Sequence, residues 1–232
     1  MSETISISTL EDDGRFDAYL ARPEGEPRAA VVVIQEIFGV NEGIRRKCDH
    51  LAEDGYLAVA PDLFWRLRPG VELDPDIEDQ FQEALGLMGR FDQDRGVRDI
   101  EATIRHIRDE LSVAKVGAVG YCLGGRLAYM VAARTDSDAT VGYYAVGIDQ
   151  LLREKHAIAN PLMLHIPTAD HFVDAATQAK MHEGLDDHPK VTLHDYPGLD
   201  HGFATEMGKR RNEEGAQLAD ARTAEFFARH LG

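Results

Sequence analysis

The chain has little cysteine, little positive charge and no long hydrophobic run. Its two cysteines, Cys48 and Cys122, provide no disulfide framework, and neither lies in a Cys/His cluster with the spacing of a zinc site. The longest apolar run, residues 29–34, is far too short to span a bilayer. Residues 1–6 lack the basic and apolar stretches of a secretory signal. We therefore expect a soluble, cytoplasmic protein.

Acidic residues outnumber basic ones by 41 to 25, which gives a formal net charge of −16. This charge repels a phosphate backbone and argues against nucleic acid as a partner. It also disfavours strongly anionic substrates unless a local basic pocket opposes it. With 232 residues, 44% of them hydrophobic, and no repeats, the chain can bury one substantial core. We expect a single domain, residues 1–232, that acts on a small molecule as a monomer or small homo-oligomer.

Short apolar strands alternate with amphipathic helices along most of the chain, which predicts an α/β fold with a mostly parallel central sheet and helices on both faces. The predicted strands are a hairpin of 5–9 and 16–21 around the acidic turn 11–14, then 29–34, 56–60, 116–120, 139–145, 162–166 and 191–196. The predicted helices are 41–55, 77–88, 94–111, a segment from the glycines 124 and 125 through 133, 175–185 and 212–231.

Residues 116–126 (VGAVGYCLGGR) predict a strand, a tight turn and a helix. Gly120-x-Cys122-x-Gly124 is the pattern of a nucleophile elbow with cysteine in place of serine. The apex residue is pushed toward positive φ, and glycine two positions away avoids a collision. The turn raises the Cys122 sulfur above the sheet at the positive end of the next helix, where thiolate is favoured. Cys122 is therefore the predicted nucleophile.

Other interpretations of these glycines fit less well. The stretch 120–125 has the glycine spacing of a P-loop, but Arg126 and Leu127 stand where that loop requires Lys and then Ser or Thr. The glycine spacing of a dinucleotide-binding loop is not met either. An inert, buried cysteine remains the alternative for Cys122.

An acid and a histidine follow the elbow in the chain order of an α/β-hydrolase triad. Asp170 lies just beyond the strand 162–166, and His201 lies in the loop after 191–196. Cys122 would attack a carbonyl, His201 would transfer the proton, and Asp170 would orient the imidazole.

Several residues compete for these two roles. His165 and His194 lie inside predicted strands, and His171 adjoins the proposed acid. Asp174 is expected at the start of a helix, and Asp200 would have to fold back onto its own neighbour. His201 and Asp170 are therefore favoured by their positions.

Five segments together resemble the dienelactone hydrolase family over nearly the whole chain: 35–39 (QEIFG), 60–64 (APDLF), 120–125 (GYCLGG), 169–173 (ADHFV) and 201–203 (HGF). The resemblance implies a cysteine-dependent hydrolase that opens an enol-lactone through an acyl-thioenzyme, without metal or organic cofactor. In that family the glutamate that matches Glu36 accepts the hydrogen bond of the resting thiol until substrate displaces it. The oxyanion would be held by two backbone N–H groups, which are those of Leu123 and Ile37 here.

The sequence departs from the family where the dienelactone enzymes clamp the substrate carboxylate. Two arginines of those enzymes match Phe81 and Thr205, and a tyrosine and a tryptophan match Leu85 and Met88. Loss of a charged partner for a buried carboxylate is costly, so we expect a substrate less anionic than dienelactone. The expected pocket comprises Phe38, Phe81, Leu85, Met88, Phe203 and Thr205. A replacement charge could come from Arg66, Arg68, Arg90, Lys209 or Arg210, but solvated surface charges are the favoured interpretation of these five residues.

The residues thus favour hydrolysis of a carboxylic ester or lactone. Hydrolysis of another activated bond, such as a thioester, would differ only in the shape of the pocket. The alternative from another class is a non-catalytic binding or redox-sensing protein that keeps the fold and a reactive thiol at Cys122.

Overall fold

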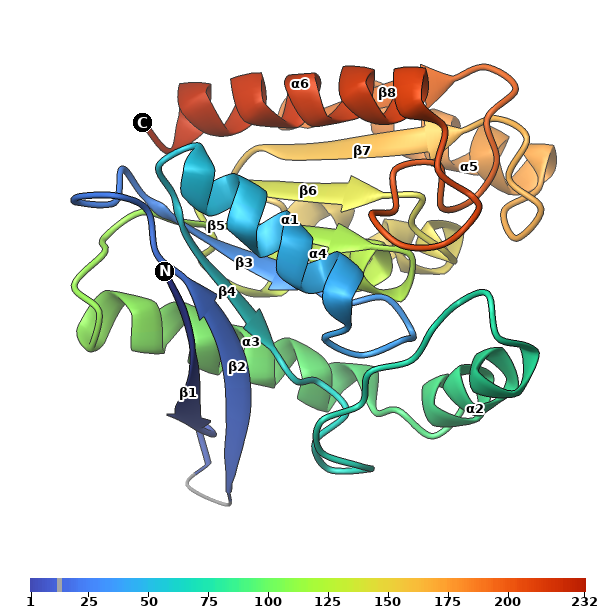
Figure 1. Ribbon diagram of the computed structural model, residues 1–232. Helices are drawn as coiled ribbons and strands as arrows, with labels where there is room; N and C mark the ends of the chain where they lie inside the picture. Colours follow the sequence, from blue (N-terminus) through green and yellow to red (C-terminus); the bar gives the residue numbers. More distant parts are fainter. Residues whose placement is uncertain (12–13) are drawn as a thin grey trace. The chain divides into compact units, whose positions relative to one another are not determined.

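The computed structural model describes residues 1–11 and 14–232. Asp12 and Asp13, in the predicted acidic turn, lie outside the described residues. The chain divides into two compact units, residues 1–117 with 206–209 and residues 118–205 with 210–232. Figure 1 shows the helices and strands of each unit along the chain. The organisation of residues 1–232 as one domain stays a prediction.

The first unit contains a short sheet with the strand order β1-β2-β4-β3. Its strands are β1 (Ser2–Ser8), β2 (Arg15–Ala21), β3 (Ala30–Ile34) and β4 (Leu57–Pro61). The predicted hairpin forms, because β1 and β2 pair in antiparallel fashion. β3 and β4 pair in parallel, and every residue of both is buried, as expected of continuously apolar strands.

Three helices belong to the first unit: α1 (Glu42–Glu53), α2 (Glu78–Met88) and α3 (Gln93–Asp109). α1 begins where predicted, because the Asn41 side chain accepts the Ile44 N–H at 3.2 Å. It ends before Gly55, which has a φ of +90°. α3 buries the apolar stripe that the sequence predicts, from Val97 to Ile107.

The second unit contains four parallel strands in the order β5-β6-β7-β8. They are β5 (Val116–Tyr121, whose last four residues belong to this unit), β6 (Thr140–Tyr143), β7 (Leu162–Pro167) and β8 (Val191–Tyr196). The helices are α4 (Leu123–Arg134), α5 (Ala175–Leu185) and α6 (Glu213–His230), with a 3-10 helix, η1 (Ile148–Ala157), that the sequence did not predict. In Figure 1, α6 runs along β7, against which it packs. Parallel strands place the loops after β5, β7 and β8 at the same edge of this sheet.

Close packing of glycines holds α4 against β6. A Cβ atom at Gly125 would lie 2.7 Å from the Tyr143 carbonyl oxygen, and one at Gly142 would lie 3.1 Å from the Gly125 carbonyl oxygen. Only glycine lets the backbones approach so closely. Across the described ranges, none of the helices combines the length and apolarity needed to cross a membrane.

Candidate active site

Cys122 occupies the turn between β5 and α4, and its backbone has the strained conformation that the elbow pattern predicts. Its φ is 57° and its ψ is −114°. The turn requires glycine at position 120, because a Cβ atom there would lie 1.9 Å from the Gly124 carbonyl oxygen. The Cys122 N–H donates to the Tyr143 carbonyl oxygen at 3.0 Å, and the side chain is half-buried. The thiol thus lies at the start of α4, next to its free backbone N–H groups.

Asp170 and His201 meet through their side chains in the second unit. The Nδ1 of His201 lies 2.9 Å from Oδ2 of Asp170. The other carboxylate oxygen of Asp170 accepts the backbone N–H groups of Phe172 and Val173, at 2.8 and 3.2 Å. Both oxygens of this buried carboxylate are therefore occupied, and the imidazole is fixed in the orientation that leaves Nε2 on its far side.

The His201 ring is enclosed by aromatic side chains. Tyr144 and Phe172 contact it edge-to-face, with ring centroids 5.0 and 4.8 Å away. Among the described residues, its buried Nε2 has no hydrogen-bond partner. Burial alone would lower the pKa of His201. The charges and hydrogen-bonding capacity of Cys122 and Asp170 outweigh that effect and raise the pKa from 6.5 to about 10.

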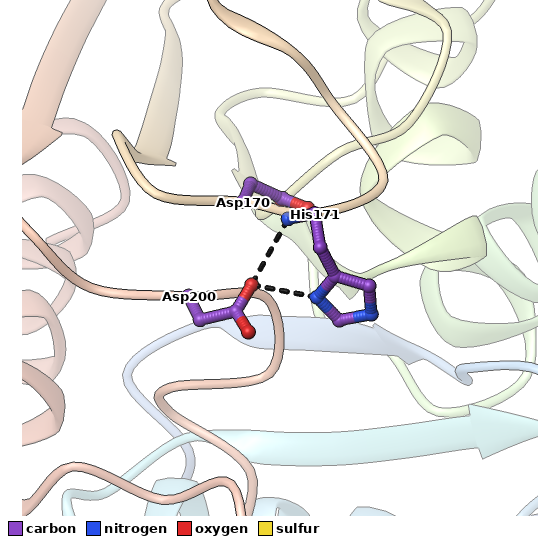
Figure 2. A group of neighbouring side chains, drawn as sticks. All are labelled: Asp170, His171 and Asp200. Carbon is purple, nitrogen blue, oxygen red and sulfur yellow. Dashed lines mark hydrogen bonds and ion pairs between the residues drawn. The ribbon is translucent and has the colours of Figure 1, made fainter.

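Asp200, a competitor for the acid role, instead holds the loops around His201. Oδ1 of Asp200 accepts hydrogen bonds from the backbone N–H and the Nδ1–H of His171, at 3.0 and 2.7 Å (Figure 2). The same oxygen accepts the His201 backbone N–H at 2.7 Å. Partial burial raises the pKa of Asp200, but these N–H donors lower it by more, so that the carboxyl is more acidic than usual. Asp200 therefore contacts the His201 backbone and not its ring.

Asp170, His171 and Asp200 have donor atoms within 4.8 Å of one another, a spacing that could hold a cation. Their hydrogen bonds with protein groups already occupy these atoms: both Asp170 oxygens are used, and His171 Nδ1 lies on Asp200. The Arg210 guanidinium, which can only donate, lies 3.3 Å from Nε2 of His171. A cation would have to displace these partners, and we assign no metal to the group.

The remaining competitors have structural contacts. His165 is buried in β7 and hydrogen bonds with the Tyr196 hydroxyl at 2.7 Å and the Thr223 hydroxyl at 3.0 Å. Asp174 caps α5, as predicted, by accepting the Thr177 N–H at 2.8 Å. Neither side chain is available to pair with His201.

The predicted residues around Glu36 belong to the first unit. β3 ends at Ile34, and Oε1 of the buried Gln35 accepts the Leu63 N–H at 3.0 Å. Glu36 and Ile37 are also buried. Gly39, with a φ of +75°, is required because a Cβ atom there would lie 1.9 Å from the Val71 carbonyl oxygen.

The predicted pocket residues fall in both units. Phe81, Leu85 and Met88 are half-buried and recur on one face of α2, and the Phe81 ring lies 6.0 Å from that of Phe38. In the second unit, Phe203 is fully buried against Tyr144 and Tyr196, and Thr205 is half-buried. Their role in a pocket stays a prediction.

The expectation of solvated surface charges is wrong for Arg66. Its guanidinium pairs with the buried carboxylate of Asp99, which also accepts the Trp65 indole N–H at 3.0 Å. Arg68 pairs with Glu83, and Arg210 lies over the Phe172 ring at 5.6 Å. Sequence reasoning could not find these contacts, nor those of Tyr144 with His201, because they join segments far apart in the chain.

Comparison with known proteins decides the family. The family profile described as "Dienelactone hydrolase family" matches residues 16–231. The chain belongs to this family. Relatives include a protein of Azospirillum brasilense assigned as a carboxymethylenebutenolidase, 46% identical over 95% of this chain and 96% of that one. The carboxymethylenebutenolidase of Pseudomonas putida is 40% identical over 98% of this chain and 97% of its own.

A crystal structure of a Klebsiella pneumoniae protein assigned as a dienelactone hydrolase is similar with a TM-score of 0.84 and 27% identity, covering 98% of this chain and 99% of that one. The dienelactone hydrolase-family chain thus has the α/β-hydrolase fold that the strand and helix order predicts. It is a hydrolase of carboxylic esters or lactones.

Proposed function

We propose that the chain hydrolyses its ester or lactone through an acyl-thioenzyme on Cys122, with His201 as general acid and base and Asp170 as the residue that orients His201. The observation that carries the proposal is the His201–Asp170 contact of 2.9 Å, and a thiolate at Cys122, once formed, would stabilise the protonated ring. Cys122 follows β5, Asp170 follows β7 and His201 follows β8, and the carboxyl ends of these parallel strands lie at the same edge of the sheet. Nucleophile, base and orienting acid on adjoining loops are the arrangement that nucleophilic catalysis requires.

The reaction has two halves. His201 takes the proton of the Cys122 thiol as the sulfur bonds to the carbonyl carbon; the carbon–oxygen bond of the ester then breaks, and His201 gives this proton to the departing oxygen. A water molecule then attacks the thioester while His201 takes its proton, the carbon–sulfur bond breaks, His201 returns the proton to the sulfur, and the acid leaves. In a lactone, the departing oxygen stays in the same product molecule.

We further propose that Glu36 controls the thiol and that the N–H groups of Ile37 and Leu123 hold the oxyanion. Leu123 is the first residue of α4 and has the orphan N–H of a helix start. Glu36 is a buried carboxylate, and such a group beside a thiol disfavours the thiolate until substrate arrives.

The substrate we propose is a small ester or lactone less anionic than dienelactone. Phe81 and Thr205 stand where the dienelactone enzymes have arginines, and the apolar side chains on the same face of α2 offer no charged partner for a carboxylate. The Phe38, Phe81, Leu85, Met88, Phe203 and Thr205 side chains would line this pocket. The proposed enzyme is cytoplasmic, monomeric or a small homo-oligomer, and binds neither nucleic acid nor membrane.

The two cysteines provide a matched experiment. Turnover of p-nitrophenyl acetate, a neutral lactone and dienelactone is measured for wild type, Cys122→Ala and Cys48→Ala. We expect Cys122→Ala to lose activity by about 10,000-fold or more, because the nucleophile is gone. Cys48 is buried in α1, and burial raises the pKa of its thiol, so Cys48→Ala keeps wild-type turnover.

Mass spectrometry of the wild-type protein during turnover should show an acyl group on Cys122. In wild type, kcat/KM for the neutral lactone should exceed that for dienelactone. Equal turnover by the two alanine variants would reject the nucleophile, whereas a preference for dienelactone would reject only the proposed substrate class.

A further inference from the structure

A hollow of about 530 Å³ lies in the second unit at the end of β7 and β8 remote from Asp170 and His201. Residues just before the two strands, Pro161 and Lys190, line it together with side chains of β8 and the second half of α6. Its volume falls within the range of small-molecule sites. The hollow is therefore large enough for a ligand and separate from the candidate catalytic residues.

Three permanent cations line this hollow, Lys190, Arg222 and Arg229, against one carboxylate, Glu225. None of the three forms an ion pair with a carboxylate of residues 1–11 or 14–232, the part of the chain that the structure describes. Elsewhere in this acidic chain, arginines do pair with carboxylates, as Arg134 does with Glu154 at 2.7 Å. A cluster of unpaired cations is therefore unusual for a chain of net charge −16.

Helix capping explains only part of the cluster. Arg229 lies in the last turn of α6, where the helix dipole favours a cation. Arg222 lies two turns earlier, with its guanidinium 5.3 Å above the Tyr196 ring, and Lys190 comes from a different segment. These two cations are not accounted for by the helix end.

Two histidines in the hollow respond to the same cations. Burial, followed by the charge of Arg222, lowers the pKa of His194. Burial, followed by the charges of Arg229 and Lys190, lowers the pKa of His230. The hollow therefore has a local positive potential that favours an anion.

The geometry points to a binding site for a small aromatic dianion between β8 and α6. A ligand with two or more negative charges could pair with the three cations. A planar ring in the ligand could stack on Phe226, which lines the hollow and is half-buried, with its ring 4.7 Å from that of His230. A long polyanion fits less well, because beyond a Debye length of about 8 Å it would meet the acidic remainder of the surface.

Benzene-1,3-dicarboxylate is a suitable probe, and calorimetry at low salt measures its binding. We compare wild type with Lys190→Glu/Arg229→Glu and with a control of the same charge change, Arg153→Glu/Lys180→Glu, whose residues are exposed and do not line the hollow. We expect saturable binding that is weakened about 10- to 100-fold in the first variant only, because charge-assisted hydrogen bonds are lost. Arg222→Gln, which keeps a polar side chain, should weaken binding less and serves as the second variant if the first folds poorly.

Proton NMR of the histidine rings adds a readout within one sample. The probe should shift the His194 and His230 resonances and leave that of His201 unchanged, and hydrolysis of p-nitrophenyl acetate should be the same in all variants. Absence of saturable binding tighter than about 10 mM would overturn the inference. So would equal weakening in both double variants, shifts confined to His201, or binding of duplex DNA or anionic vesicles through these cations in place of the probe.

Discussion

The two ends of the β7–β8 pair differ in whether their charged side chains have hydrogen-bond or ion-pair partners. At the carboxyl ends, Asp170 has both oxygens occupied, and His201 is buried against it at 2.9 Å. At the amino ends, the cations that line the hollow have no carboxylate partner within the described ranges. A preorganised polar group lowers the barrier of a reaction, whereas unpaired charges attract a partner from solution. The same two strands therefore support chemistry at one end and favour binding at the other.

Removal of the buried charge at the carboxyl ends should have the largest effect. Asp170→Asn replaces the oxygen that accepts the His201 Nδ1–H or the oxygen that accepts two backbone N–H groups, so the imidazole is no longer held in the required tautomer. We expect kcat for a neutral aryl ester to fall roughly 1,000- to 10,000-fold with little change in KM.

Asp200→Asn is the matched control at this end of the strands. Asp200 is exposed and contacts the backbone of His201, so loss of its charge should lower kcat only about 3- to 10-fold. Equal losses in the two variants would show that both carboxylates act on the ring and would remove the distinction between them. Thermal unfolding of both proteins checks that the fold is intact.

The fold and the order of the proposed catalytic residues could be predicted because they depend on local patterns. Apolar runs predict β3 to β8, and glycine spacing predicts the positive φ of Cys122. Contacts between distant segments could not be predicted. The sequence disfavours Asp200 as the acid because its side chain would have to fold back onto the neighbouring residue, yet this side chain reaches the His201 and His171 backbones.

The basic hollow was also beyond sequence reasoning. Lys190 and Arg229 are 39 positions apart in the sequence and show no motif. Only the packing of α6 against β7 brings both residues to one hollow. The η1 helix was missed for a related reason, since its ten residues, IDQLLREKHA, lack a clear apolar stripe. A cluster of cations from distant segments, or a helix without an apolar stripe, can be recognised only once the tertiary contacts are known.

Packing at the elbow should produce the next largest effect. Gly120→Ala would place a methyl group 1.9 Å from the Gly124 carbonyl oxygen, so β5 and α4 must separate. We expect the free energy of unfolding, measured with urea, to fall by about 2–3 kcal/mol. Gly86→Ala is the control, because no described atom outside the local backbone of α2 lies within 4 Å of its Cβ position, and it should raise stability by about 0.5–1 kcal/mol. Similar losses in the two variants would mean that the elbow is not tightly packed.

The pKa values of the histidines at the two ends should be shifted in opposite directions. NMR titration of the wild-type protein should give a His201 pKa near 10 and place His194 and His230 below 6.5. Burial lowers all three, but only His201 has negative charges beside it that reverse the effect. Cys122→Ala removes one of those charges, so the His201 pKa should fall in that variant while the other two stay unchanged.

The stability of the protein should follow these shifts. Because the folded protein binds the His201 proton more tightly than the unfolded chain, this stabilisation is complete below pH 6.5 and is lost as the pH rises toward about 10. The stability difference between wild type and Cys122→Ala should therefore shrink over that interval. For His194 and His230 the sign is reversed, since the unfolded chain binds protons more tightly and acidification below 6.5 destabilises the fold. If His201 titrated together with His194, the two ends of the strands would be electrostatically alike, and the charge of Cys122 could not be acting on the imidazole.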